Sequence, residues 1–84
     1  MNLNEYLSMK DAPSISRLRE AMISIGYEVK SDAQIRQWRH GYRGRRPSPE
    51  NCTGLELVTN GAVTRSELRP TDFLRIWPEL SDSN

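Results

Sequence analysis

The residues best suited to chemistry lie between positions 30 and 46, KSDAQIRQWRHGYRGRR, which hold six of the chain's twelve lysines and arginines. Arg36 and Gln37 are adjacent in this stretch. Arginine and glutamine make paired hydrogen bonds to the edges of guanine and adenine, respectively, and further basic side chains contact phosphates. This basic segment, residues 30–46, therefore has the residue types needed to bind a nucleic acid and to distinguish its bases.

The charge of the chain is unevenly distributed. Its net charge is only +1, which by itself argues against a nucleic-acid binder. Residues 1–29 carry a net charge of −1, the basic segment +5 and residues 47–84 −3. A basic stripe between acidic flanks is typical of a local site for an anion, and a solvated surface is the alternative interpretation.

Catalysis and metal binding have little support in the sequence. His40 and Cys52 are each the only member of their residue type. A metal site or a Cys–His nucleophile pair would need further ligands or partners that the chain does not supply. We therefore expect no enzyme, no catalytic residue, no metal, no cofactor and no small-molecule substrate. Cys52 is expected to pack as a small apolar side chain.

Size and composition predict one small globular domain. The chain has 84 residues, of which 36% are apolar and 27% charged. Its single cysteine and the absence of a signal-peptide pattern predict a cytoplasmic protein, and no stretch approaches the roughly 18 apolar residues of a membrane span. We expect residues 1–80 to form the domain and residues 81–84 a disordered tail.

The elements that position the basic segment are predicted to be helices. Capping residues and apolar periodicity predict helices over 3–9, 15–25, 31–40 and from Ser48-Pro49 to Asn60-Gly61. Thr64 and Glu67 have the spacing of a capping box for one more turn, and TDFLRIW after Pro70 can form another. Residues 62–63 are alternatively a short extended piece. The predicted fold is an all-α, compact five-helix bundle.

Apolar spacing also predicts which side of each helix is buried. The expected core residues are Leu18, Ala21, Met22 and Ile25 in the second helix, Ile35 and Trp38 in the third, and Cys52, Leu55 and Val58 in the fourth. Trp38 follows Ile35 by three positions, which favours a core residue over a platform for base stacking.

The predicted helices 15–25 and 31–40 are typical of a helix-turn-helix. In that motif the later of the two helices, here 31–40, enters the major groove of DNA. Residues expected to read base edges are Ser31, Asp32, Ala33, Arg36 and Gln37. Residues expected to contact phosphates are Arg17, Lys30, Arg39, His40, Arg43, Arg45 and Arg46. Asp32 is alternatively a complement to the helix dipole, and Arg17 an ordinary exposed arginine.

Several motifs also resemble a known family. NLNEYL, SDAQIRQWRHG, RRPSPENC and NGAVTRSELRP followed by IWPEL are similar to the Cro-type helix-turn-helix repressors of phages and prophages, in the YdaS-like branch. The resemblance covers nearly the whole chain. It implies a lambda-repressor-like domain that binds palindromic operator DNA as a homodimer and regulates transcription. One departure is the larger separation between Gly26 and Ile35, which predicts a longer turn.

Two classes of function remain open from the sequence. One is a sequence-specific DNA-binding regulator whose partner is double-stranded operator DNA. The other is a toxin-antitoxin or other protein-interaction module that uses the same fold. Leu57 lies off the buried stripe of its helix, so either TDFLRIW folds back over it within the chain or both meet their copies across a two-fold axis. The resemblance to Cro-type repressors implies the second, a homodimer interface of Leu57, Phe73 and Trp77, and we expect no membrane partner.

Overall fold

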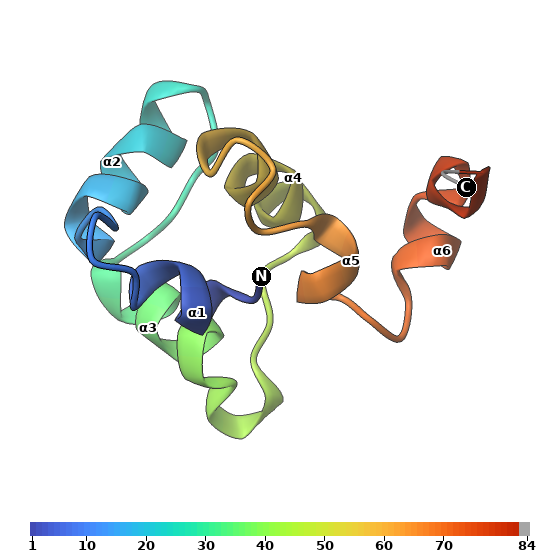
Figure 1. The fold of residues 1–84 in the computed structure, drawn as a ribbon, viewed down its shortest axis with the longest axis horizontal. Helices are drawn as coiled ribbons and strands as arrows, with labels where there is room; N and C mark the ends of the chain where they lie inside the picture. Colours follow the sequence, from blue (N-terminus) through green and yellow to red (C-terminus); the bar gives the residue numbers. More distant parts are fainter. Residues whose placement is uncertain (83–84) are drawn as a thin grey trace.

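The computed structural model describes residues 1–82, which form α-helices and 3₁₀-helices without any strand (Figure 1). The elements of this part of the chain are α1 (Leu3–Leu7), α2 (Ile15–Ser24), α3 (Asp32–His40), η1 (Tyr42–Gly44), α4 (Pro49–Val58), α5 (Arg65–Leu68), α6 (Phe73–Ile76) and η2 (Pro78–Asp82). The predicted all-α class is confirmed, and the extended alternative for residues 62–63 is not adopted.

The described residues contain six α-helices where a five-helix bundle was expected, and the last two are the separate turns predicted on either side of Pro70. Proline has no N–H to donate and disfavours the helical conformation in the residue before it. Arg69 accordingly adopts φ −134° and ψ 68°, so that α5 ends at Leu68 and α6 begins anew at Phe73.

Side-chain caps define where most of these helices start. A side-chain oxygen accepts the N–H of the third helical residue at Asn2, Ser14, Ser31, Ser48 and Thr64. At the other end of α3, Gly41 takes the left-handed conformation (φ 63°, ψ 30°) that favours glycine. Local sequence signals therefore position both ends of the helix that carries Arg36 and Gln37.

The core is formed by side chains of α1 to α4, of the connection between α2 and α3, and of the connection between α4 and α5. Fully or almost fully buried side chains come from Leu3, Leu18, Met22, Val29, Ile35, Trp38, Cys52, Leu55 and Val63. The expected burial of Ile25 is wrong, since its side chain is 49% exposed. Because α2 ends at Ser24, Ile25 leaves the helical register of Met22, and Val29 of the following connection is buried instead.

Helix α3 lies at one edge of the molecule. Helix α2 packs against both α3 and α4, and α1 packs against α3 (Figure 1). The segment formed by α6 and η2 extends away from this body after α5 (Figure 1). Residues 81 and 82 of the expected tail belong to η2, and residues 83–84 lie outside the described part. None of the helices in residues 1–82 is long and apolar enough to cross a membrane.

Candidate nucleic-acid interface

Arg19 of α2 fixes the connection that leads into α3. Its Nε donates to the Val29 carbonyl at 3.0 Å and its Nη2 to the Lys30 carbonyl at 2.9 Å. The same guanidinium lies 3.9 Å from Asp32 Oδ1 at the first turn of α3. One side chain thus spans α2, the seven-residue connection 25–31 and α3. Sequence reasoning missed this role, because Arg19 has the ordinary pattern of a surface arginine on a helix.

Two residues expected to read bases already have partners within the protein. Ser31 Oγ accepts the Gln34 N–H at 3.3 Å as the cap of α3. Asp32 Oδ2 accepts a hydrogen bond from Ser16 Oγ at 2.5 Å, in addition to facing Arg19. These contacts tie the start of α3 to α2, and neither residue lines the hollow described next.

One face of α3 is hollowed and open to solvent. The α3 hollow is lined by Ala33, Arg36, Gln37, His40 and Tyr42. The four α3 residues follow the i, i+3, i+4, i+7 spacing of a single helix face. Within residues 1–82, neither Arg36 nor His40 makes a side-chain hydrogen bond or ion pair, and both are exposed. This face therefore presents donors without partners beside the Ala33 methyl and an aromatic ring.

The loop after α3 folds back along the hollow. Backbone hydrogen bonds from Gly44 to the Gly41 carbonyl and from Arg45 to the Tyr42 carbonyl, each 2.9 Å, close it. Arg43 has a positive φ of 52°, and its guanidinium carbon lies 5.3 Å from the centre of the Tyr42 ring. Arg45 Nη1 donates to Gln37 Oε1 at 3.3 Å. Tyr42 is the site residue that sequence reasoning missed, and its only signal was an aromatic residue among arginines.

The other expected phosphate contacts lie in different settings. Arg39 clamps α1 to α3, with Nε donating to Asn4 Oδ1 at 2.8 Å and Nη2 to Ser8 Oγ at 3.0 Å. Arg46 Nη1 donates to Thr71 Oγ1 at 3.2 Å. Arg17 is exposed on α2 and Lys30 is exposed just before α3.

A second hollow joins several of these basic residues. It lies between α1, the end of α3 and α5, and its lining includes Arg39, His40, Arg45 and Arg46. His40 and Arg45 thus connect it to the α3 side of the molecule. The hydrogen-bond acceptors of Arg39 and Arg46 are neutral oxygens, although the charge of Arg46 also helps to lower the pKa of Asp72 and Glu67 lines the same hollow.

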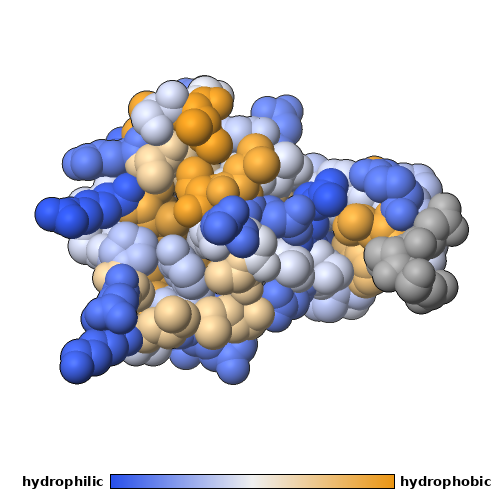
Figure 2. All heavy atoms as spheres, turned by 45° about the horizontal axis from the view of Figure 1, so that its top comes forward, coloured by the Kyte–Doolittle hydropathy of each residue, from blue (hydrophilic) through white to orange (hydrophobic). Residues whose placement is uncertain are grey.

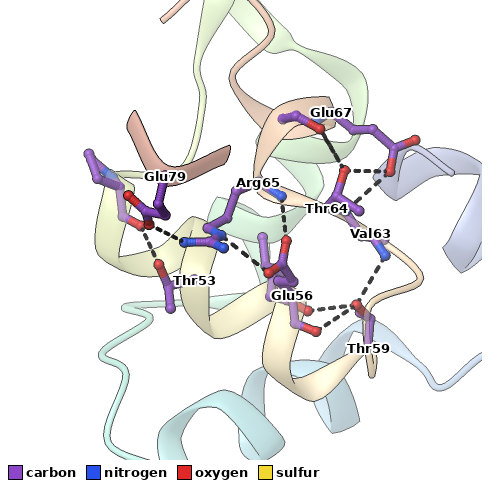
Figure 3. Close-up of polar contacts among 11 residues, drawn as sticks. Thr53, Glu56, Thr59, Val63, Thr64, Arg65, Glu67 and Glu79 are labelled. Carbon is purple, nitrogen blue, oxygen red and sulfur yellow. Dashed lines mark hydrogen bonds and ion pairs between the residues drawn. The ribbon is translucent and has the colours of Figure 1, made fainter. Parts of the chain in front are cut away.

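A polar cluster holds the carboxy-terminal part of the chain (Figure 3). Glu56 accepts both the backbone N–H of Arg65 at 2.8 Å and its Nε at 3.2 Å, and Arg65 Nη1 lies 3.6 Å from Glu79. The Arg65 guanidinium carbon also lies 5.2 Å from the centre of the Trp77 ring. Among the expected interface residues, Trp77 and Phe73 are half-buried, whereas Leu57 is 58% exposed.

Cys52 is buried under the loop that joins the basic segment to α4. Its Sγ lies 3.6 Å from the Pro47 carbonyl oxygen, and burial raises the pKa of the thiol to about 11. A thiol with so high a pKa stays protonated at neutral pH, so Cys52 packs as an apolar side chain, as expected. No group of three His, Cys, Asp or Glu side chains within residues 1–82 is arranged to hold a metal ion.

Comparisons of the chain with protein-family models, curated proteins and solved structures found no match. The resemblance to Cro-type repressors therefore remains a prediction from the quoted motifs. The geometry of α3 and the loop that follows it carries the functional argument.

Proposed function

We propose that this protein is a sequence-specific DNA-binding regulator in which α2 and α3 act as a helix-turn-helix. The observation that carries the proposal is the exposed face of α3. Arg36 and Gln37 lie there side by side on a helix that is capped at both ends and tied to α2 through Arg19. Such a rigid helix with unpartnered donors has the chemistry required to read base edges in a major groove.

Positive charge around this face supports the same function. Arg17, Lys30, Arg43 and Arg45 are exposed and lie on or next to the two helices. Long basic side chains at the edges of a reading helix neutralise phosphates and set the register of the protein on the duplex. Asp32, the one acidic side chain of the basic segment, is compensated by Arg19 and Ser16 rather than facing the hollow unpaired.

The regulator is proposed to bind palindromic operators as a homodimer and to repress transcription, as the resemblance to Cro-type repressors implies. Two reading helices related by a two-fold axis would contact half-sites one helical turn apart. Exposed Leu57 supports a contact between copies, with Phe73 and Trp77 as the further proposed residues.

Selection of bound duplexes from a random pool tests this function. We expect a palindromic consensus for the unmodified protein and loss of preference at one base pair per half-site for Arg36→Ala. Arg75→Ala is the matched control, because Arg75 is an exposed arginine on α6 outside the basic segment. A pool without any enriched sequence would contradict the proposal, as would an equal effect of the two variants.

An apolar surface favours a second candidate, a protein-interaction module such as a toxin or antitoxin subunit. Apolar side chains gather where α2 meets α4 (Figure 2). The large apolar side chains exposed on these helices and at the end of α2 are Ile23, Ile25 and Leu57. Exposed apolar clusters of this kind mark protein contacts. Failure to enrich DNA, together with loss of self-association or partner binding in Leu57→Ser, would favour this candidate.

A further inference from the structure

The α3 hollow has a hydrogen-bonding polarity that the residue types alone do not reveal. Gln37 Oε1 accepts a hydrogen bond from Arg45 Nη1 at 3.3 Å, so the side chain presents its amide N–H₂ group as a donor. The neighbouring Arg36 also offers only donors. The paired contact of glutamine with adenine requires the same oxygen to accept from the adenine amino group. In that contact an adenine would have to share this oxygen with the Arg45 guanidinium, whereas the amide N–H₂ group of Gln37 is not shared.

Three bases present acceptors to such a donor in the major groove, and the walls of the hollow distinguish among them. Guanine offers O6 and N7, adenine offers N7, and thymine offers O4 beside its C5-methyl group. The hollow places the Ala33 methyl and the Tyr42 ring around Gln37, and Tyr42 is 50% exposed. An apolar contact favours thymine, because neither guanine nor adenine has a methyl group to fill it.

We propose that the α3 hollow reads a thymine, with the Gln37 amide donating to O4 and the C5-methyl group lying between Ala33 and Tyr42. The inference rests on the proposed function and deepens it by naming the base. Tyr42 is then a specificity-determining residue outside the reading helix, and Arg45 a positioning residue that acts through Gln37.

The loop is built to keep Tyr42 in this place. Gly41 reverses the chain in the left-handed conformation, and the two backbone hydrogen bonds of η1 close the turn that follows. The Arg43 guanidinium beside the Tyr42 ring further restricts that side chain. A preordered ring costs less entropy when it contacts DNA.

The first experiment removes the methyl group from the DNA. In the selected duplex, the base pair that loses preference in Gln37→Ala identifies the position read by the hollow, and we expect an A·T pair there, with its thymine as the base that the hollow contacts. Replacing that thymine with deoxyuridine should weaken binding about fourfold per half-site, which is the worth of one buried methyl group. Tyr42→Ala should abolish this penalty, and Tyr42→Phe, which keeps the ring, should retain it.

The second experiment frees the oxygen of Gln37. In Arg45→Ala, Gln37 no longer shares its oxygen, so the paired contact with adenine can replace the contact with thymine, and the penalty for deoxyuridine should shrink. Lys30→Ala is the matched control: it removes an exposed cation of the basic segment and should weaken binding while the deoxyuridine penalty stays the same.

The outcomes separate the inference from the function on which it rests. A G·C pair at the Gln37 position in the unmodified protein, or equal binding of thymine and deoxyuridine duplexes, would overturn the thymine assignment while leaving DNA recognition in place. An unchanged deoxyuridine penalty in Arg45→Ala would overturn the positioning role. A pool that yields no consensus at all would overturn both the inference and the proposed function.

Discussion

Arg36 in the basic segment has an environment opposite to that of Arg65 and Arg69 in the carboxy-terminal segment 64–79. Arg36 is exposed and has no hydrogen-bond or ion-pair partner within residues 1–82. Arg65 and Arg69 are only 19% and 20% exposed, and each faces carboxylates. Arg69 Nη1 also donates to the Pro47 carbonyl at 2.8 Å. The same residue type thus stabilises the fold at Arg65 and Arg69 and remains available for a ligand at Arg36.

The difference shows why counts of basic residues predict binding poorly. A cation that already shares carboxylates must give up those contacts before it can neutralise a phosphate. Arg39 and Arg46 are intermediate cases, because they lie in the basic segment but donate to neutral side-chain oxygens. They can strengthen the local positive field while they stabilise the fold.

The largest expected effect is the salt dependence of DNA binding. If each protomer neutralises about four phosphates, through Arg17, Lys30, Arg43 and Arg45, a dimer neutralises about eight. The logarithm of affinity should then fall against the logarithm of salt with a slope of roughly −7, which is about 10⁴-fold between 50 and 200 mM. Fluorescence anisotropy at several salt concentrations measures this slope. A slope near zero would show that the exposed basic side chains do not neutralise phosphates.

A stability measurement tests whether the arginines of the carboxy-terminal segment stabilise the fold. Arg69→Ala removes a charged donor from the buried Pro47 carbonyl and an ion pair with Asp72 at 3.1 Å. We expect the free energy of unfolding to fall by about 1.5 to 3 kcal/mol in urea titrations. Arg36→Ala, at an exposed position, should change it by less than about 0.5 kcal/mol. Equal losses in the two variants would show that exposure and partners do not distinguish these arginines.

A smaller effect on the free energy of unfolding is expected when the pH is lowered. Burial opposes ionisation of Glu67, but hydrogen bonds from the Met1 ammonium and from Thr64 outweigh it and lower the pKa of the carboxyl group. A lowered pKa in the folded state gives stability that is present above the unfolded value of 4.5 and is lost as pH falls through the folded value. Glu67→Gln should remove this pH-dependent contribution, worth less than about 1 kcal/mol at a partly exposed site. Urea titrations at pH 6 and pH 3 compare the two proteins, and an identical pH dependence would contradict the assignment.

Local signals in the sequence predicted much of the fold. Caps such as Ser31 and Thr64 act on residues three positions away, so a linear pattern contains both partners. The core positions Met22, Ile35 and Leu55 follow from helical spacing in the same way. The prediction that Ile25 is buried is wrong because α2 ends at Ser24, one residue earlier than the apolar pattern indicates.

The candidate site was harder to predict because its decisive contacts are not local. Arg39 meets Asn4, 35 positions away, and Arg46 meets Thr71, 25 positions away. The pairing of Arg45 with Gln37 and the position of Tyr42 depend on how the loop turns after Gly41. Residue types identified the basic segment, but only the folded chain separates its available side chains from those already bonded.

The central claim, that the exposed face of α3 reads DNA, is tested most directly by the affinity of Arg36→Ala for two duplexes. One duplex carries the consensus obtained by selection, and the other is its scrambled version. We expect a loss of about 1 to 3 kcal/mol per half-site on the consensus duplex and a much smaller loss on the scrambled one. Equal weakening on both duplexes would show that Arg36 contacts only phosphates and would contradict the assignment of α3 as the reading helix.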